Sequence, residues 1–350
     1  MTAGDRCSLF FSSRRARGST PVAATTVVGG MRAAVRSHFG PPETVRVADV
    51  DRPEPGPREV LVRVHATTVN RTDCGYRAGE PLIMRLFAGL RTPKFAVLGT
   101  EFAGIVEAVG GGAGRFAPGD RVCGYNEKSF GAHAEFMTIH EEGSVVAMPP
   151  NLEFEEAAAG FEGSHYALAN LRAAKVGAGC DVLVYGATGA IGSAAVQLAV
   201  ALGANVTAVC RGEHVDLVAG LGAGRVIDYL TEDFTAGDAT YDVVFDAVGK
   251  TAYGHCRPLV RPGGVFAATD LGPFPWNPLL AMTTRIGGRR RVVFALPKDD
   301  REVMSYLCDR LASGEFRPVV DRTYPLDDIV EAYRYVETGQ KVGNVVIRLA

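Results

Sequence analysis

The feature that most restricts the fold of this chain is a mostly apolar run that leads directly into a glycine-rich turn. Residues 182–185 form the run, Gly186-Ala-Thr-Gly-Ala-Ile-Gly192 follows, and an alanine-rich stretch comes next. This order predicts a strand, a tight turn and a helix whose first backbone N–H groups face a pyrophosphate. The spacing is GxxGxxG rather than GxGxxG, and we interpret it as a dinucleotide site rather than a purely structural turn. The residues expected to contact the dinucleotide are Gly186, Ala187, Thr188, Gly189, Ala190, Ile191 and Gly192.

The end of the next apolar run, residues 205–210, should select the cofactor. An acidic residue about 20 positions after the first glycine would bind the ribose 2′-hydroxyl of NADH. Cys210 and Arg211 stand there instead, and a guanidinium can hold a 2′-phosphate through two hydrogen bonds. We therefore expect NADPH (NADP). Two alternatives stay open, since Arg211 is also a plausible surface charge and Glu213 is close enough to hold a ribose.

The organisation of the chain changes near residue 151. Its 350 residues exceed one ordinary core and indicate about two domains. Short β-like runs fill residues 31–150, whereas apolar strands then alternate with helical stretches through residue 271, which predicts βαβ units on a parallel sheet. Residues 1–30 have no apolar period and are expected to be a disordered extension. Their few acidic residues and several arginines also resemble an organelle transit segment.

Composition excludes several function classes. The 37 basic and 39 acidic residues give a net charge of -2, and only 8% of residues are aromatic, so we expect no nucleic-acid partner. The longest apolar region is interrupted by polar residues and glycine, so we expect no membrane span. The seven cysteines are at least about 30 residues apart and form no CxxC pair. That pattern favours a reducing, cytoplasmic location.

Several ordered motifs together resemble the medium-chain dehydrogenase/reductases over residues 31–350. Within this superfamily the chain looks most like the zinc-independent quinone oxidoreductase branch, some of whose members are described as NAD(P)-dependent alcohol dehydrogenases. The motifs are Val97-Leu-Gly-Thr-Glu-Phe-Ala-Gly-Ile-Val106, Gly119-Asp-Arg-Val122, the glycine turn, Leu221-Gly-Ala223, Val226-Ile-Asp-Tyr229, Tyr241-Asp-Val-Val-Phe-Asp-Ala-Val-Gly249, Arg261-Pro-Gly-Gly264 and Gly343-Asn-Val-Val-Ile347.

The resemblance implies an α/β protein with two domains. A Rossmann domain, a doubly wound parallel sheet that binds the dinucleotide, is expected over residues 153–296. A β-rich GroES-like catalytic domain is expected from residues 31–152 together with residues 297–350. The resemblance also implies a homodimer, which is common in this branch.

The resemblance further implies that the protein works without a metal. Zinc-dependent relatives place a Cys where this chain has Asn70, a His where it has Thr100, and another Cys near Gly160. None of these residues replaces a thiolate or an imidazole as a Zn²⁺ ligand. The lobe that binds structural zinc in relatives is also missing, because no cysteine lies between Cys74 and Cys123.

Without a Lewis acid, oxidation of a simple alcohol is difficult, whereas a conjugated carbonyl compound or a quinone is already activated. We therefore expect NADPH-dependent reduction of an enone, enal or quinone. Asn70 and Tyr76 lie in the segment that lines the cleft beside the nicotinamide in relatives, and we expect them to donate hydrogen bonds to the developing oxyanion. Tyr76 is also a candidate proton donor, although solvent protonation and a packing role are equally consistent with the sequence.

Two further catalytic candidates, Glu162 and His165, stand where relatives face the nicotinamide. A structural role is the more common one for a histidine or a glutamate on a helix. The resemblance also places residues from later loops against the cofactor. These residues are Tyr229, Asp246, Val248, Asp270, Leu271 and Asn344.

Two apolar segments, residues 81–90 and 274–282, are expected to line the substrate pocket or to form an oligomer interface. Their composition favours a small hydrophobic substrate. Two other functions remain open. The first is a zinc-free NADP-dependent alcohol or aldehyde dehydrogenase with Glu162 or His165 as the base, and the second is a non-catalytic NADPH-binding protein.

Overall fold

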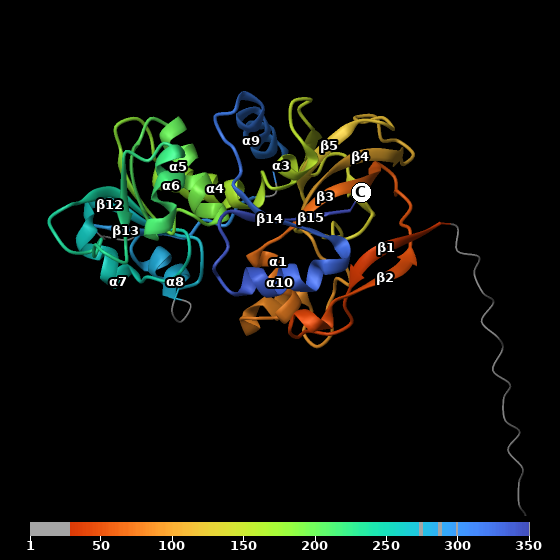
Figure 1. The fold of residues 1–350 in the computed structure, drawn as a ribbon, viewed down its shortest axis with the longest axis horizontal. Helices are drawn as coiled ribbons and strands as arrows, with labels where there is room; N and C mark the ends of the chain where they lie inside the picture. The colour runs from red at the N-terminus through yellow and green to blue at the C-terminus, as the bar shows by residue number, and fades with distance from the viewer. Residues whose placement is uncertain (1–28, 273–275, 286–288, 299, 350) are drawn as a thin grey trace, which may run out of the picture.

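The computed structural model describes residues 29–272, 276–285, 289–298 and 300–349. Its β-strands form one parallel sheet, one larger mixed sheet and a separate hairpin-like pair, and Figure 1 shows the two larger sheets in two lobes side by side. The expected extension, residues 1–30, falls outside the described residues except for Gly29 and Gly30. None of the helices in the described residues is long and apolar enough to span a membrane.

The parallel sheet has the strand order β10-β9-β8-β11-β12-β13. All of its neighbouring strands run parallel. Numbered along the sheet's own sequence, this order is 3-2-1-4-5-6, the doubly wound order, in which ligands bind at the carboxyl ends of the central strands. The strands are β8 (Asp181–Tyr185), β9 (Asn205–Cys210), β10 (Arg225–Asp228), β11 (Tyr241–Asp246), β12 (Val260–Ala268) and β13 (Arg291–Val293).

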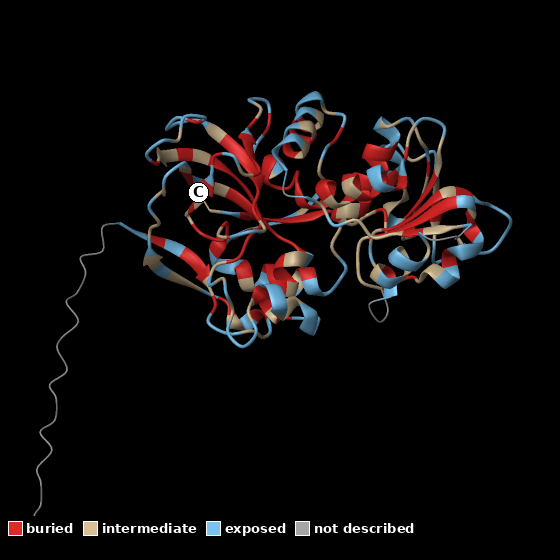
Figure 2. Cartoon of the chain, turned by 180° about the vertical axis from the view of Figure 1, so that it is seen from behind, coloured by how far each residue is buried: buried red, intermediate tan, exposed pale blue. Residues whose placement is uncertain are grey.

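Helices cover both faces of this sheet, and the side chains of its central strands are buried between them (Figure 2). Leu183 and Phe245, for example, have no exposed surface. The helices of this lobe are α4 (Glu162–Ala174), α5 (Ala190–Ala201), η3 (Gly212–His214), α6 (Val215–Gly220), α7 (Tyr253–Cys256), η4 (Arg257–Leu259) and α8 (Trp276–Thr283). The α/β fold expected from the sequence is confirmed.

The second sheet has the order β14-β15-β3-β4-β5-β7, and β6 also pairs with β3. The last strand of the chain, β15, therefore lies beside an early strand, with Val345 opposite Val69. The strands are β3 (Glu59–Val69), β4 (Glu101–Val109), β5 (Arg121–Tyr125), β6 (Phe136–His140), β7 (Val145–Ala147), β14 (Val320–Pro325) and β15 (Asn344–Arg348), while β1 (Gly30–Val35) and β2 (Arg46–Asp51) form the separate pair.

Helices from both ends of the chain pack around this second sheet. Helix α10 contacts α1, β3 and β15, and α9 contacts β7 and α4. The remaining helices are η1 (Pro42–Thr44), α1 (Arg71–Ala78), η2 (Leu82–Met84), α2 (Arg85–Ala88), α3 (Phe154–Ala158), α9 (Arg301–Ser313), η5 (Leu326–Asp328) and α10 (Ile329–Glu337).

One hydrophobic core runs through the junction of the two lobes. It joins Ala103 and Cys123 of the mixed sheet to Val184 and Phe245 of the parallel sheet, with Phe161 at the start of α4 between them. Each of these side chains is at least 98% buried. On the opposite side of this core, the start of α4 meets polar residues of α1 and β4, and these polar residues form the centre of the candidate site.

Candidate active site and dinucleotide site

The glycine turn lies between β8 and α5, as the sequence predicted. Gly186 has a φ of +81°, which other residues adopt only with strain. A Cβ atom on Gly192 would lie 2.0 Å from the carbonyl oxygen of Gly186, so the helix can start this close to the strand only with glycine there. Gly189 caps α5 without a side-chain hydrogen bond. The 12-residue helix thus presents backbone N–H groups at its start, which fits a dinucleotide pyrophosphate.

A second segment of the chain is fixed to this turn. The N–H of Gly343 donates to the carbonyl oxygen of Thr188 at 2.7 Å. Gly343 has a φ of +75°, and a Cβ atom on it would lie 2.1 Å from the carbonyl oxygen of Val319. Asn344 follows and is buried, and both its N–H and its side-chain amide donate to Val319, at 2.8 and 3.1 Å. Asn344 therefore lies beside the turn with its amide bonded to the backbone.

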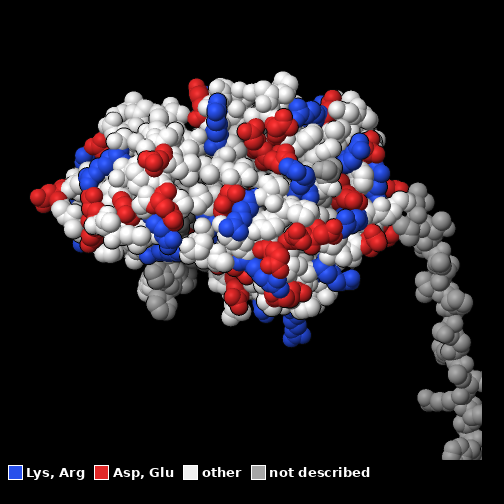
Figure 3. All heavy atoms as spheres, in the orientation of Figure 1, with Lys and Arg blue, Asp and Glu red and all other residues white. Residues whose placement is uncertain are grey.

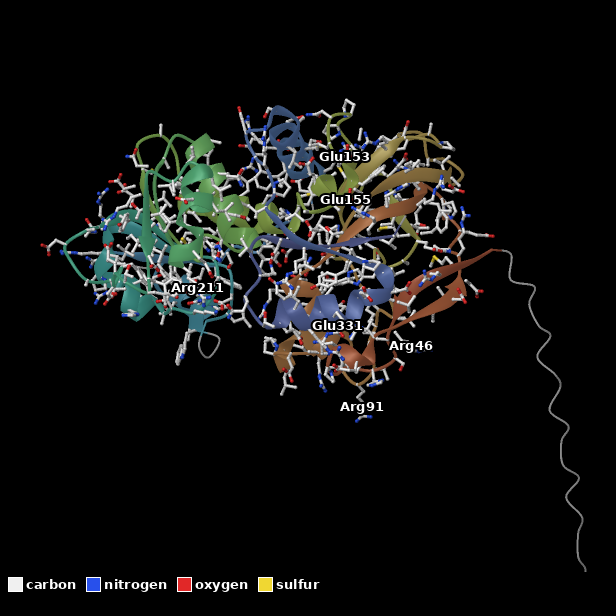
Figure 4. All side chains as sticks on the ribbon, viewed as in Figure 1. Arg46, Arg91, Glu153, Glu155, Arg211 and Glu331 are labelled. Carbon is white, nitrogen blue, oxygen red and sulfur yellow. The ribbon has the colours of Figure 1, made fainter. Side chains whose placement is uncertain are left out.

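The carboxyl end of β9 presents a cation. Arg211 is 41% exposed, and its guanidinium lies 3.3 Å from the carboxylate of Glu213. Hydrogen bonds to Tyr229 and Glu213 raise the pKa of Arg211, and Figure 4 shows Arg211 on the lobe of the parallel sheet. Cys210 instead points into the core. Burial raises the pKa of its thiol to about 11, so Cys210 is a neutral, packed side chain near pH 7.

The loops after β11 and β12 meet over the glycine turn. Asp246 accepts hydrogen bonds from the N–H groups of Val248 and Gly249, at 3.0 and 2.9 Å, and burial raises its pKa to about 6. The side chain of Val248 fills the space that a Cβ on Gly186 would need. Asp270 accepts from Gly272 N–H at 3.0 Å, and Leu271 accepts from Asn277 N–H at 3.2 Å. In this structure both aspartates hold their own loops in shape.

A buried carboxylate joins the mixed sheet to helix α4. One oxygen of Glu101 accepts hydrogen bonds from the N–H groups of Phe161 and Glu162, at 3.0 and 2.6 Å. Its other oxygen accepts from the hydroxyl of Thr68. Because these N–H groups begin α4, the carboxylate also lies at the positive end of the helix. Glu101 thus fixes where α4 starts.

Glu162, the first residue of α4, faces this cluster. Its side chain is buried, and one carboxylate oxygen accepts a hydrogen bond from the Thr72 hydroxyl at 3.0 Å. Burial and the neighbouring charge of Glu101 raise the pKa of Glu162 to about 7, although Lys341 and Thr72 act in the opposite direction. An acid with such a pKa exchanges protons near neutral pH.

Asn70 lies next to this cluster and has several partners. Its side-chain oxygen accepts from Asp73 N–H at 2.9 Å and caps α1, while its amide nitrogen donates to the Thr100 hydroxyl at 2.7 Å. Burial raises the pKa of Glu101, and a hydrogen bond from Asn70 is among those that act in the opposite direction. Gly160 stands at the third position where zinc-dependent relatives are expected to have a metal ligand. A Cβ atom on Gly160 would lie 2.6 Å from the Cδ1 atom of Leu311, so this glycine packs closely against Leu311. Over the described ranges, no group of three or more His, Cys, Asp or Glu residues is placed to hold a metal ion.

Tyr76 and His165 lie at the edges of the cluster. The Tyr76 ring packs 4.6 Å from the Phe130 ring, and burial raises its pKa to about 12. The Nε2 atom of His165 lies 2.7 Å from the carbonyl oxygen of Lys298, and its ring meets Tyr125 edge-on. The structure thus brings Asn70 and Glu162 into one hydrogen-bonded region.

Glu101 and three further residues of this region, Thr72, Tyr166 and Lys341, were missed at the sequence level. Thr72 donates to Glu162, and the charge of Lys341 acts on Glu162. Burial raises the pKa of Tyr166, and a hydrogen bond with Thr72 acts in the opposite direction. The spacing of Glu162 and Tyr166, four residues apart on one helix, was an available signal because such residues share a helix face.

Comparison with known families gives two matches. Residues 56–150 match the alcohol dehydrogenase GroES-like domain, and residues 221–347 match the family described as zinc-binding dehydrogenase. Among curated proteins, quinone oxidoreductase from Sus scrofa is 31% identical over 89% of this chain and 95% of its own length. The 2-methylene-furan-3-one reductase of Solanum lycopersicum is 29% identical over 96% of this chain and 84% of its own length.

Solved structures are similar over a comparable range. The quinone oxidoreductase from Coxiella burnetii has a TM-score of 0.82 and 25% identity, and the match covers 92% of this chain and all of that one. A structure described as an NAD-dependent alcohol dehydrogenase has a TM-score of 0.80 and 28% identity over 91% of this chain and all of its own.

The contacts of Glu101 generate a stability prediction. Glu101→Ala would leave two N–H groups and one hydroxyl without their buried acceptor, so we expect it to lower the free energy of unfolding by about 2–4 kcal/mol. Glu107→Ala, on the same strand, removes only partly exposed ion pairs with Arg52 and Arg63 and should cost less than about 1 kcal/mol. Urea denaturation of both variants measures the difference, and equal losses would contradict the role assigned to Glu101.

Proposed function

Since the chain belongs to the medium-chain dehydrogenase/reductase superfamily, in its quinone oxidoreductase-like branch, and is an oxidoreductase with a nicotinamide cofactor, we propose that it uses NADPH to reduce a conjugated C=C bond or a quinone without zinc. The observation that carries this proposal is the hydrogen bond between Asn70 and Thr100, 2.7 Å long. It joins the two positions where zinc-dependent relatives are expected to have Cys and His. An amide and a hydroxyl that bind each other form a polar site suited to hydrogen bonding rather than to Zn²⁺.

The substrate in this proposal supplies its own activation. When bound, NADPH provides a hydride, and in a conjugated carbonyl compound or a quinone the resulting negative charge collects on an oxygen. What the protein must add is a proton and hydrogen-bond donors near that oxygen. The relatives described as 2-methylene-furan-3-one reductase and NADPH-dependent alkenal/one oxidoreductase support the conjugated C=C class.

Glu162 is the proton donor we propose, through its carboxyl oxygens. Its pKa of about 7 leaves much of it protonated at neutral pH, and the Thr72 hydroxyl holds the carboxyl in place. His165 is bonded to a backbone carbonyl and Tyr76 is packed among phenylalanine rings, so we propose that they shape the site. Asn70 is proposed to orient Thr100 and to complete the polar wall of the cleft.

NADPH is favoured over NADH in this proposal because of Arg211. Its guanidinium is partly exposed at the carboxyl end of β9. In this fold, residues at that position contact the adenosine ribose of the dinucleotide. Tyr229 lies against the same guanidinium and is partly exposed itself. Together they offer a charged and an aromatic group to a 2′-phosphoadenosine.

A hydrophobic substrate is proposed from the apolar side chains on two segments. Leu82, Leu86 and Phe87 are each more than 60% exposed, and Met282 on α8 is 70% exposed. Figure 4 shows Arg91 projecting from the end of the lobe that carries the first segment. Acidic and basic side chains are interleaved on the face shown in Figure 3, so this face carries no broad basic patch for a polyanion.

The proposal is tested by NADPH oxidation with a panel of substrates. We expect turnover with a 1,4-benzoquinone, an enone and an enal, slow or no turnover of primary alcohols with NADP⁺, and unchanged rates after treatment with a zinc chelator. About one zinc per chain by elemental analysis, with chelator-sensitive alcohol oxidation, would instead establish a zinc alcohol dehydrogenase. Activity on alcohols without zinc would favour the zinc-free dehydrogenase.

Cofactor preference gives a second prediction. Arg211→Ala should weaken NADPH binding roughly ten- to hundred-fold, the loss typical of a charge-assisted hydrogen bond. NADH binding should barely change, because NADH has no 2′-phosphate. Arg225→Ala, which removes an exposed arginine of the same sheet paired with Glu232, is the control. Dissociation constants for both cofactors measure this, and a wild type that binds both equally would show that Arg211 is a surface charge.

The acid role of Glu162 predicts a pH dependence. The pKa is raised, so the protonated donor is present below about pH 7 and is lost as the pH rises through that value. We therefore expect kcat to fall above about pH 7. Glu162→Gln should lower kcat roughly 10²- to 10⁴-fold and abolish this decline, whereas His165→Gln should retain it. A decline that persists in Glu162→Gln would assign the titration to another group.

A further inference from the structure

The segment that precedes β15 connects the glycine turn to the acidic cluster. Gly343 donates its N–H to the carbonyl oxygen of Thr188, in the turn. The carbonyl oxygen of the same Gly343 accepts a hydrogen bond from the ammonium of Lys341. Gly343 therefore forms one hydrogen bond with the glycine turn and another with the Lys341 ammonium. Through Gly343, the Lys341 ammonium is thus linked by hydrogen bonds to the glycine turn.

Lys341 also interacts electrostatically with two carboxylates. Its positive charge acts on Glu162 and Glu101, and it lowers the pKa of Glu162. Lys341 is half-buried, and burial lowers the pKa of its ammonium. Glu162 interacts electrostatically with titratable groups from five parts of the chain. These groups are Asp73, Glu101, Tyr125, Glu127, Tyr166 and Lys341.

In this group acids outnumber bases, and Lys341 is the one lysine or arginine in it. A pyrophosphate at the start of α5 would bring further negative charge to the same ammonium. A single cation cannot fully compensate a carboxylate and a pyrophosphate at once, because each anion weakens its attraction for the other.

We propose that Lys341 is a counter-ion shared between the pyrophosphate of the dinucleotide and the carboxylate of Glu162, so that cofactor binding and the charge of Glu162 are coupled. The inference rests on the proposed function for the identity of the cofactor and for the role of Glu162. When the dinucleotide binds at the glycine turn, its pyrophosphate attracts the Lys341 ammonium, which then stabilises the Glu162 carboxylate less. The protonated form of Glu162 is therefore favoured. By reciprocity, neutralising Glu162 tightens binding of the dinucleotide. Cofactor binding thus prepares the acid before the substrate arrives.

The test is a double-mutant cycle on dinucleotide affinity. Lys341→Met should weaken the binding of NADPH and of NADH about equally, by roughly ten-fold. Arg211→Ala, by contrast, should weaken the binding of NADPH alone. Glu162→Gln should tighten both cofactors when Lys341 is present and have little effect when residue 341 is Met. Lys175→Met, at the far end of α4 from Glu162, is the matched control and should leave both affinities unchanged. Lys341→Arg keeps the charge and should preserve the coupling.

A proton count provides a readout that a merely structural lysine would not move. Calorimetric titration with NADH near pH 7, in buffers of different ionisation enthalpy, should show proton uptake by the wild type. This uptake should disappear in Glu162→Gln. NADH is the probe because its lack of a 2′-phosphate removes that group's own titration.

The outcomes separate the inference from the function it rests on. Additive effects of the two substitutions, or identical proton uptake in wild type and Glu162→Gln, would overturn the shared counter-ion while leaving NADPH-dependent turnover in place. A wild type that binds neither cofactor would overturn the proposed function. If Lys341→Met fails to fold, Lys341→Arg together with the proton count on Glu162→Gln still decides the question.

Discussion

The rest of the site depends on the buried carboxylate of Glu101. A carboxylate without exposed surface is stable only if its oxygens are bonded, and this one accepts from Thr68 and from the two N–H groups that begin α4. The same contacts fix the mixed sheet against the dinucleotide lobe. They also place a negative charge beside Glu162, and that charge is, after burial, the largest cause of the raised pKa of Glu162. A structural bond between the lobes therefore also sets the acid–base chemistry of the cleft.

Much of the fold was predictable because its strongest signals are local. The glycine turn needs residues without a Cβ at Gly186 and Gly192, where the backbone is left-handed or the strand and helix approach closely. Such requirements are written in a few consecutive residues. The pairing of Val345 with Val69 is different, since it joins segments far apart in the chain. Nothing local in either strand specifies that partner, and only the family resemblance implied the return of the chain to the first sheet.

The candidate site was less predictable, for the same physical reason. Asn70 and Glu162 were recognised, but the Thr72 hydroxyl and the Lys341 ammonium reach Glu162 from elements distant in sequence. Threonine and lysine are ordinary surface residues, so their types alone carried no signal. Side-chain direction was also beyond the sequence. The side chain of Cys210 points into the core and that of Asn344 bonds the carbonyl oxygen of Val319, while their contacts with the cofactor stay predictions.

The charges around Glu162 bear on what it means chemically that Asn70 and Thr100 stand where zinc-dependent relatives are expected to have Cys and His. Asp73, Glu101 and Glu162 act on one another, and all three have raised pKa values. In a zinc-dependent relative, a divalent cation held by thiolates and imidazole compensates charge of this kind. Asn70 and Thr100 are neutral and bond each other, and the positive charges that act on these carboxylates include those of Lys341 and Arg36. In the function we propose, a carboxyl group with a raised pKa supplies the proton that reduction of a conjugated carbonyl compound requires after hydride transfer.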